Sequence, residues 1–345
     1  MQRDKVYRKR TEKKIRRFLI AGLLVPACLL SACGSTKAAS QKTMTLLEQE
    51  IAKGSTAEYD GTEWIIDSDA AELPKVFRTM QSVFGKAKDK YKMDANYVPS
   101  RQGMEQCRMS GSAQFSLDGL RLLAAEIKKQ SDGPVYIVDL RQESHGFLNG
   151  TAVSWYGKND WSNIGMTREE VLADEKERLQ DTVGKQTEIC TLDGEKNADE
   201  KRTIETVQAL TEEEAVKNEG LQYFRITATD HAWPEPECID AFIEFVKKLP
   251  RDSWLHFHCA GGVGRTVEFM AMYDMICNPD VSLKDIEYRQ CLLGGNYLGY
   301  RPADGQAGWK TPYYNEKADM AEKFYTYVQD EAADGFAVSW SEWLL

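Results

Sequence analysis

A cysteine and an arginine six positions apart are the residues of this 345-residue chain best suited to covalent chemistry. They lie in the segment His258-Cys-Ala-Gly-Gly-Val-Gly-Arg-Thr266, with Cys259 and Arg265 at the two ends of a glycine-rich loop. Glycines let successive backbone N–H groups face one point and bind an anion, and an arginine fork grips two phosphate oxygens. Because a thiolate is a strong nucleophile, the segment predicts phosphoryl transfer to Cys259.

The elements around this loop fit the same chemistry. Residues 253–258 are typical of a buried strand, and residues 266–277 of an apolar, buried helix. The loop therefore opens a helix, whose N-terminus favours a thiolate over a thiol. We expect Thr266 to donate a hydrogen bond to the sulfur and help it leave, and His258 to fix the loop from behind.

Strands and helices alternate along the rest of the chain, which indicates an α/β fold. Strands are expected at 135–140 and 221–228, and helices at 239–249, 282–293 and 315–330. Capping boxes at Thr167-Arg-Glu-Glu170 and Thr211-Glu-Glu-Glu214 predict two further helix starts. Residues 151–207 are charged and turn-rich, and composition alone leaves open a small inserted domain or one long surface excursion.

The N-terminus has the pattern of an export signal. A basic run from Arg3 to Arg17 precedes an apolar stretch, residues 18–32, that is too short to span a bilayer. The stretch ends Leu30-Ser-Ala-Cys33-Gly34, which resembles a bacterial lipobox with Cys33 as the lipid acceptor. We therefore expect a lipoprotein-type signal peptide over 1–32 and a lipid-anchored tether over 33–58. The protein would be exported and attached to the bacterial cell envelope, on its periplasmic or cell-surface face.

Charge and cysteine content narrow the class of protein. Residues 1–32 carry a net charge of +7 within a chain of net charge −10, so the remainder carries −17. Such an acidic body excludes general nucleic-acid binding, and an anionic substrate would need a locally positive pocket. Apart from Cys28 and Cys33, the cysteines form no CxxC pair, which favours neither zinc nor a disulfide scaffold: Cys107, Cys190, Cys238, Cys259, Cys277 and Cys291.

The segment 258–266 resembles the signature of the cysteine-dependent protein tyrosine phosphatase superfamily. The resemblance implies a cysteinyl-phosphate intermediate, no metal or other cofactor, and an aspartic general acid on a loop. Asp230, in Thr229-Asp-His-Ala-Trp-Pro234, follows a predicted strand and is the candidate acid. The alternative is that Asp230 caps the helix beginning near Pro236.

Other segments resemble a narrower group, the bacterial phosphatase-like cysteine phytases. These are Asp139 to Gly150, Ser110 to Phe115 and the pair Asp230-His231, and the similarity extends from about Trp64 to Tyr327. It implies stepwise hydrolysis of myo-inositol hexakisphosphate by a protein tyrosine phosphatase-like fold with a small partial β-barrel insertion. The insertion would occupy 151–207, and the phosphatase domain 59–150 and 208–345.

A pocket for so anionic a substrate needs dispersed cations around the loop. Lys310 and Lys317, seven residues apart with Tyr314 between them, would supply donors at its rim. Family resemblance adds the other expected substrate contacts, which are the loop residues Ala260, Gly261, Gly262, Val263 and Gly264 together with Arg78, Asp160, Lys196 and His231. One departure is Ala260, where many relatives have an acidic residue, which puts the rate, the pH optimum and the order of phosphate removal in doubt.

Several alternatives stay open from the sequence. Arg141, Glu143 and His145 follow a buried strand and either position the catalytic loops or form a structural cluster. The activity could instead be that of a phosphotyrosine or dual-specificity protein phosphatase, although no phosphotyrosine-recognition loop is recognisable. A non-catalytic lipoprotein that binds phosphorylated ligands is the third candidate. We expect a monomer or a weak homodimer.

Overall fold

The computed structural model describes residues 44–53 and 63–345. The predicted signal peptide, Cys33 and most of the predicted tether lie outside the described residues. Within the described part, residues 46–52 of the expected tether form a helix, α2 (Leu46–Ala52). No helix in residues 44–53 and 63–345 combines the length and apolar composition that a membrane span requires.

The sheet that carries the nucleophile loop has five strands in the order β10-β4-β11-β3-β2. They are Gln222–Arg225 (β10), Val135–Asp139 (β4), Trp254–His258 (β11), Met109–Ser112 (β3) and Arg78–Thr79 (β2). All neighbours are parallel except β2, which pairs antiparallel with β3. Because helices cover both faces, β3 and β11 are buried along their whole length, as central parallel strands are.

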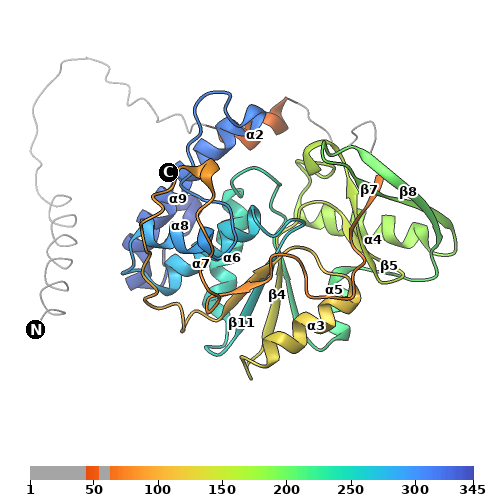
Figure 1. Ribbon diagram of the computed structural model, residues 1–345, viewed down its shortest axis with the longest axis horizontal. Coiled ribbons are helices and arrows are strands. Elements are labelled where there is room, and N and C mark those ends of the chain that lie inside the picture. The colour runs from red at the N-terminus through yellow and green to blue at the C-terminus, as the bar shows by residue number, and fades with distance from the viewer. Residues whose placement is uncertain (1–43, 54–62) are drawn as a thin grey trace, which may run out of the picture. The chain divides into compact units, whose positions relative to one another are not determined.

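Two apolar clusters fill the two faces of this sheet. On one face, Ile137 packs with residues of α3 (Leu117–Lys128) and α5 (Glu212–Asn218). On the other, Val138 and Phe257 pack with α6, α7 and α9, which lie together in Figure 1. The helices on that side are Pro236–Lys248 (α6), Arg265–Cys277 (α7), Leu283–Leu292 (α8), Thr311–Glu331 (α9) and Trp340–Trp343 (α10).

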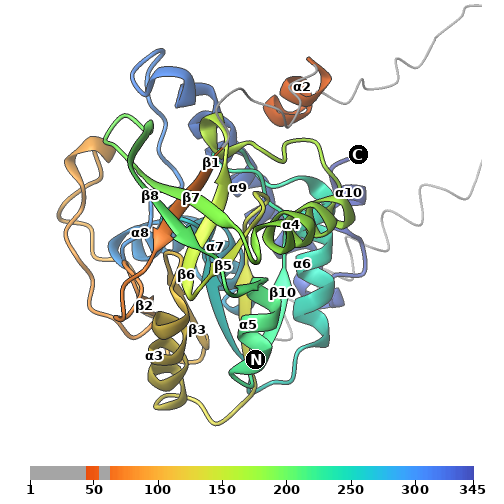
Figure 2. The same ribbon diagram turned by 90° about the vertical axis from the view of Figure 1, so that its right-hand side faces the viewer.

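A second, six-stranded sheet has the order β8-β7-β1-β6-β5-β9 (Figure 2). Its strands are Glu63–Ser68 (β1), His145–Leu148 (β5), Thr151–Tyr156 (β6), Gln186–Leu192 (β7), Ala198–Glu205 (β8) and Ala209–Leu210 (β9). Helix α4 (Arg168–Thr182) packs on it through Leu179. The sheet is open, with β8 and β9 at its edges. Only three of these strands, β6, β7 and β8, lie in the segment 151–207, so this sheet also uses strands from the regions assigned to the phosphatase domain.

Most of the expected elements are confirmed, with boundaries shifted by a few residues. The strand expected at 221–228 is the shorter β10, and the helix expected at 315–330 begins earlier, as α9 at Thr311. Thr167 and Thr211 form the predicted capping boxes of α4 and α5. Short 3-10 helices complete the chain at Asp89–Tyr91 (η1), Lys158–Asp160 (η2), Gly308–Lys310 (η3) and Ala332–Asp334 (η4).

Candidate active site

The nucleophile loop joins the C-terminal end of β11 to the N-terminus of α7. The Cys259 side chain is 3% exposed, and its sulfur accepts hydrogen bonds from the Gly262 N–H and the Thr266 hydroxyl, each at 3.2 Å. Gly262 has a φ of +70°, and a Cβ there would lie 2.4 Å from the backbone nitrogen of Ala113. Only glycine therefore fits this turn, which aims a backbone donor at the thiol.

Arg78, on β2, supports the nucleophile loop through hydrogen bonds to backbone carbonyls. Its Nη1 donates to the Gly262 carbonyl at 2.8 Å and to the Val76 carbonyl at 3.1 Å, and the residue is 2% exposed. Burial lowers the pKa of Arg78 to about 10, and the nearby Cys259 works in the opposite direction. The sequence predicts Arg78 as a substrate contact, and the structure places its guanidinium on the backbone of the loop that would hold the substrate.

Arg265 is fixed by a buried carboxylate. Its Nη1 and Nη2 donate to the two oxygens of Glu143 at 2.6 and 2.9 Å, and both side chains are at most 1% exposed. The other edge of the guanidinium faces two more carboxyl groups, with Nε 3.2 Å from Asp230 and Nη2 3.5 Å from Asp160. One edge of the fork is thus anchored and the other is turned toward the predicted general acid.

The structure places Asp230, the predicted general acid, beside Arg265 at the end of the nucleophile loop. Its two oxygens lie 3.2 Å from Arg265 Nε and 3.1 Å from His231 Nε2. Burial opposes ionisation of this carboxyl, but the charges of Arg265 and His231 outweigh it and lower its pKa. Glu235, not Asp230, occupies the N-cap position of α6, so the alternative role as a helix cap is wrong.

Asp160, another predicted contact, lies on η2 beside Arg265. It is 8% exposed and has a left-handed backbone, with a φ of +64°. Burial and the charge of Glu143 raise the pKa of Asp160 well above its ordinary value, although Arg265 and Arg141 oppose this. A protonated Asp160 is a hydrogen-bond donor and adds no negative charge to the site.

Predicted cations lie around the loop, mainly on the first turns of α9. Lys317 Nζ is 2.6 Å from Glu268 Oε1, and Lys310 stands over the Trp309 ring. Burial lowers the pKa of Lys310, and so do the charges of Lys196 and Lys317, although Asp230 opposes them. Lys196 is exposed in the turn between β7 and β8. The structure thus brings the three predicted lysines within electrostatic range of one another.

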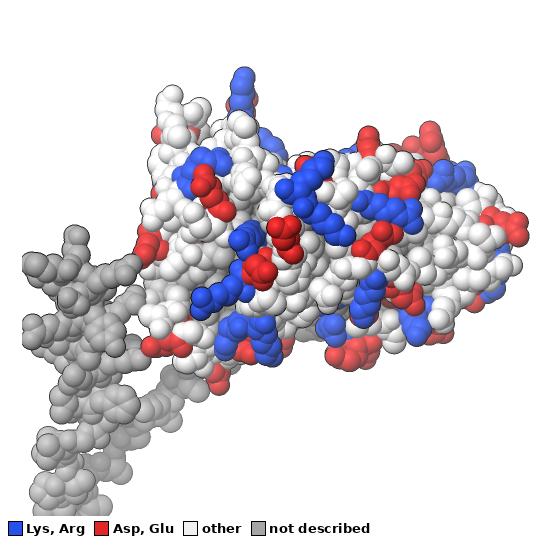
Figure 3. All heavy atoms as spheres, turned by 90° about the horizontal axis from the view of Figure 1, so that it is seen from below, with Lys and Arg blue, Asp and Glu red and all other residues white. Residues whose placement is uncertain are grey.

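His231 and Tyr314 complete the predicted rim. The His231 ring meets the Trp309 ring edge-on at 5.2 Å, and the Tyr314 ring meets Tyr300 in the same way at 5.3 Å. Burial lowers the pKa of His231 to about 4, with Lys310 and Lys317 acting in the same direction, so this imidazole is neutral near pH 7. Positive charge is not a general property of the surface, because basic and acidic side chains are interspersed on the face drawn in Figure 3.

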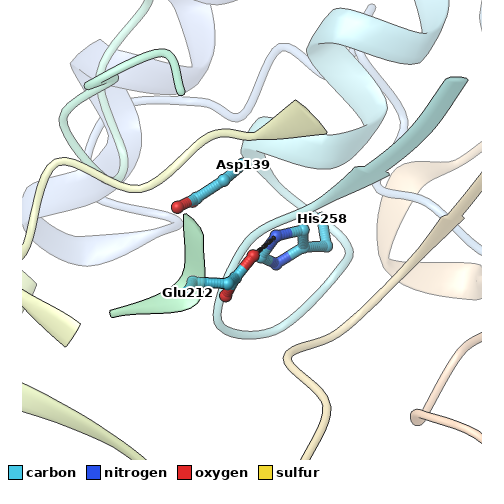
Figure 4. Close-up of side chains that lie close together, drawn as sticks. All are labelled: Asp139, Glu212 and His258. Atoms are coloured by element: carbon cyan, nitrogen blue, oxygen red, sulfur yellow. Dashed lines mark ion pairs between the residues drawn. The ribbon is translucent and has the colours of Figure 1, made fainter. Parts of the chain in front are cut away.

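Behind the loop, His258 is held by a buried glutamate that the sequence analysis missed. Glu212 Oε1 lies 2.7 Å from His258 Nε2, and both side chains are fully buried (Figure 4). Gln114 donates to the other oxygen of Glu212 at 2.7 Å, and its backbone N–H donates to the Ala260 carbonyl. Glu212 thus holds the His258 ring, and Gln114 contacts the loop backbone; the role predicted for His258 in fixing the loop stays a prediction. Glu212 was missed because its sequence context, a capping box with three glutamates, indicates only an exposed first helical turn.

Arg141, Glu143 and His145 belong to the same buried network. Arg141 Nε donates to Glu143 at 2.6 Å, so Glu143 bridges Arg141 and Arg265. Burial opposes ionisation of Glu143, but Arg265 and Arg141 hold the pKa of its carboxyl far below its ordinary value. His145 Nε2 lies 3.0 Å from Asp139, whose charge raises the pKa of His145 to about 10 despite burial. Glu143 therefore positions Arg265, and His145 belongs to the structural cluster behind it.

Asp139, Glu212 and His258 also have the composition of a metal site, with one potential ligand atom each within 4.8 Å of the others. The surroundings do not fit a cation. Arg225 Nη1 is 2.9 Å from Asp139 Oδ2, and the Tyr223 hydroxyl donates to the same oxygen. These carboxylates are neutralised by neighbouring positive charge, so we interpret the cluster as an ion-pair network that supports the loop.

Comparison with known proteins points to one family. The PTP-like phytase family model, described as inositol hexakisphosphate, matches residues 138–277. A solved PTP-like myo-inositol phosphatase from Mitsuokella multacida, in complex with myo-inositol-(1,3,4,5)-tetrakisphosphate, is 47% identical with a TM-score of 0.80, covering 83% of this chain and 49% of that one. A solved PTP-like phytase from Bdellovibrio bacteriovorus is 33% identical with a TM-score of 0.64, and the match covers 83% of this chain and 95% of that one.

A curated relative, effector protein hopD2 of Pseudomonas syringae pv. tomato, is 26% identical over 250 residues, which are 70% of this chain and 52% of that protein. The chain thus spans about half the length of this relative and of the Mitsuokella protein. The Bdellovibrio phytase, by contrast, is covered almost completely. Together with the geometry of Cys259, Arg265 and Asp230, these similarities show that the chain belongs to the protein tyrosine phosphatase-like phytase family.

Proposed function

We propose that the chain is a cysteine-dependent phosphatase that removes phosphates stepwise from myo-inositol hexakisphosphate. The observation that carries this proposal is the convergence of the Cys259 thiol, the Arg265 fork and the Asp230 carboxyl inside a rim of lysines. A phytase family relative solved with a myo-inositol tetrakisphosphate supports the same substrate class.

In the first step the Cys259 thiolate attacks phosphorus, an S–P bond forms, and the bond between phosphorus and the bridging inositol oxygen breaks, so that this oxygen stays on the inositol ring. The loop N–H groups and the outward edge of Arg265 stabilise the phosphoryl oxygens, because their charge builds up where those donors point. Protonated Asp230 gives its proton to the leaving inositol oxygen. In this role Asp230 needs a proton that its pairing with Arg265 disfavours, so a bound phosphate must draw Arg265 away from Asp230.

In the second step water attacks the cysteinyl phosphate, the S–P bond breaks and phosphate is released. Asp230, now a carboxylate, accepts a proton from the attacking water. The Thr266 hydroxyl donates to the departing sulfur, which its 3.2 Å distance to Cys259 already allows. Each group therefore returns to its starting protonation state, and the cycle requires no metal.

The rim favours a polyphosphate over a single phosphate on an apolar group. Lys310 lies close enough to Lys196 and Lys317 for their charges to lower its pKa, and each of these lysines can pair with a phosphate remote from the scissile one. The raised pKa of Asp160 favours its protonated form, which can donate to a phosphate oxygen without repelling it. A phosphotyrosine peptide has one phosphate and would leave most of these donors without a partner.

The test compares phosphate release from myo-inositol hexakisphosphate and from phosphotyrosine peptides, with a metal chelator present. We expect chelator-insensitive release from the inositol substrate. Cys259→Ser should abolish it, and Cys277→Ser, at an exposed cysteine, should not. Preference for the peptides would overturn the proposed substrate class and make the chain a protein phosphatase. No turnover of either substrate would favour a phosphate-binding lipoprotein.

We further propose that the protein is exported and anchored to the cell envelope through a lipid on Cys33. The support is the sequence alone, with the segment Leu30-Ser-Ala-Cys33-Gly34 placed after a basic and an apolar stretch. Cys33→Ser should move the protein from the membrane fraction to the soluble fraction without changing its specific activity. Unchanged membrane association of this variant would contradict the anchor.

A further inference from the structure

A small apolar cluster joins α2 to the loop that carries Asp230. Leu47, on α2, is 1% exposed and packs in one cluster with Trp161, Ile164, Ala232 and Tyr313. These residues come from four separate parts of the chain. The cluster is separate from the two that fill the main sheet, so its interior depends on the few side chains that form it.

The cluster holds the acid loop on both sides of His231, the residue that follows the acid. On one side, the Trp161 indole N–H donates to the Asp230 carbonyl at 2.8 Å. On the other, Ala232, two residues further on, is fully buried within the cluster. His231 between them has a φ of +67°, a conformation that non-glycine residues adopt only when their surroundings hold them there. The backbone at residues 230–232 is therefore fixed by packing.

Helix α2 reaches this position through contacts of its own. Thr45 and Glu48 form a capping box that starts the helix, and the Leu46 N–H donates to Glu316 Oε1 on α9 at 2.9 Å. Figure 1 shows α2 beside α9, although the two helices are far apart in the sequence. A seven-residue helix is unstable alone in water, so its place on α9 depends on these contacts and on buried Leu47.

We propose that Leu47 is a positioning residue for the general acid, acting through Trp161 and Ala232 on the backbone of Asp230. This inference rests on the proposed function, in which Asp230 protonates the leaving oxygen. Truncating Leu47 leaves a cavity beneath the acid loop and lets Asp230 shift, while Cys259 and Arg265 keep their own supports in β11, Arg78 and Glu143.

A displaced general acid has a specific kinetic signature. An inositol oxygen or a phenoxide leaves poorly without a proton, whereas p-nitrophenoxide is stable enough to leave unaided. Loss of proton donation therefore slows hydrolysis of inositol phosphates and phenyl phosphate, and spares p-nitrophenyl phosphate. A general loss of folded protein lowers all three rates by one factor.

The experiment measures kcat/KM for these three substrates in the full-length protein and in Leu47→Ala, because kcat/KM reports the steps up to departure of the leaving group and excludes the second step, in which Asp230 also takes part. Because a general acid contributes about 10²–10⁴-fold, we expect a displaced one to lower kcat/KM by about fivefold or more on the inositol substrate and on phenyl phosphate. The rate on p-nitrophenyl phosphate should change by less than about twofold. Asp230→Asn should show the same pattern more strongly, and adding Leu47→Ala to it should cause no further selective loss.

Two variants serve as controls. Met44→Ala truncates a side chain that is 47% exposed just before α2, and should match the wild type. Leu123→Ala truncates a fully buried leucine on α3, in another cluster, and should lower the melting temperature without changing the ratio of the rates. Equal losses on all substrates in Leu47→Ala, or no loss, would overturn the inference. A wild type active on phenyl phosphate but not on the inositol substrate would refute the proposed function alone, because the aryl pair would still decide the role of Leu47.

Discussion

Replacing Glu143 by glutamine removes the negative charge that holds Arg265 in place. Glu143 is fully buried and accepts three short hydrogen bonds from guanidinium groups, at 2.6 and 2.9 Å from Arg265 and at 2.6 Å from Arg141. Removing one partner from a buried ion pair costs about 3–5 kcal/mol. The amide oxygen of glutamine in the Oε1 position retains the bonds from Arg141 Nε and Arg265 Nη2 and loses the bond from Arg265 Nη1, so we expect a loss of about 3 kcal/mol in the free energy of unfolding at pH 7.

The stability difference should depend on pH in a defined direction. The pKa of Glu143 is lowered in the folded protein, so its contribution is complete above the unfolded value of about 4.3. It is lost as the pH falls below that value, because protons then bind the unfolded carboxyl first. Urea unfolding at pH 7 and at pH 3.5 should therefore show a larger difference between wild type and Glu143→Gln at pH 7.

The same substitution should impair catalysis. An arginine that is no longer held by two parallel hydrogen bonds samples other orientations, and a misplacement of about 1 Å costs on the order of 10²-fold in rate. We expect a loss of about that size in kcat/KM for inositol hexakisphosphate. Glu177→Gln, at an exposed glutamate on α4, is the matched control. The reasoning is refuted if Glu143→Gln unfolds at the wild-type urea concentration and keeps kcat/KM within about twofold.

Two further predictions concern the rim. Lys310→Ala should raise KM for inositol hexakisphosphate by about fivefold and weaken the dependence of KM on salt, because Lys310 would contact only phosphates remote from the scissile one. Hydrolysis of p-nitrophenyl phosphate should not change. Steady-state kinetics at two ionic strengths would check this, and an equal effect on both substrates would contradict it. The wild type should lose stability as the pH falls from 6.5 to 4, because the folded protein lowers the pKa of His231 to about 4 and the unfolded chain binds the proton first. His231→Asn, with a residue that tolerates positive φ, should remove this loss. Parallel pH dependences of the melting temperature in variant and wild type would contradict this.

The sequence was sufficient to predict three of the five strands of the central sheet, β4, β10 and β11, and to single out candidate reacting groups. A glycine-rich loop between a buried strand and a helix permits few geometries, so the positions of Cys259 and Thr266 follow from local chain chemistry. Asp230 was predicted because the resemblance requires an acid on a loop and the chain has one after β10. The capping boxes at Thr167 and Thr211 were reliable because their signal lies within four residues.

What the sequence did not reveal depends on contacts between distant segments. Glu212 occupies an acidic helix start, and only its contact with His258 shows that it supports the nucleophile loop. Leu47 lies in a stretch expected to be a tether, and its burial depends on α9 and on Trp161. For Arg78, the resemblance suggests a contact with the substrate, whereas in the structure its guanidinium donates a hydrogen bond to the Gly262 carbonyl. None of these three environments leaves a local pattern.

The pairing of the two sheets has a consequence for how the chain is made. In the second sheet Glu63 pairs with Tyr156 and Ile65 with Cys190, and in the first β3 pairs with β11 at Leu255 and Met109. A chain synthesised from its N-terminus therefore cannot complete the nucleophile-bearing sheet until β11 has been made. Such long-range closure makes folding slow and leaves strand edges open in the meantime. A chain made only as far as α6 therefore has every strand of the second sheet but lacks the centre of the sheet that carries the nucleophile.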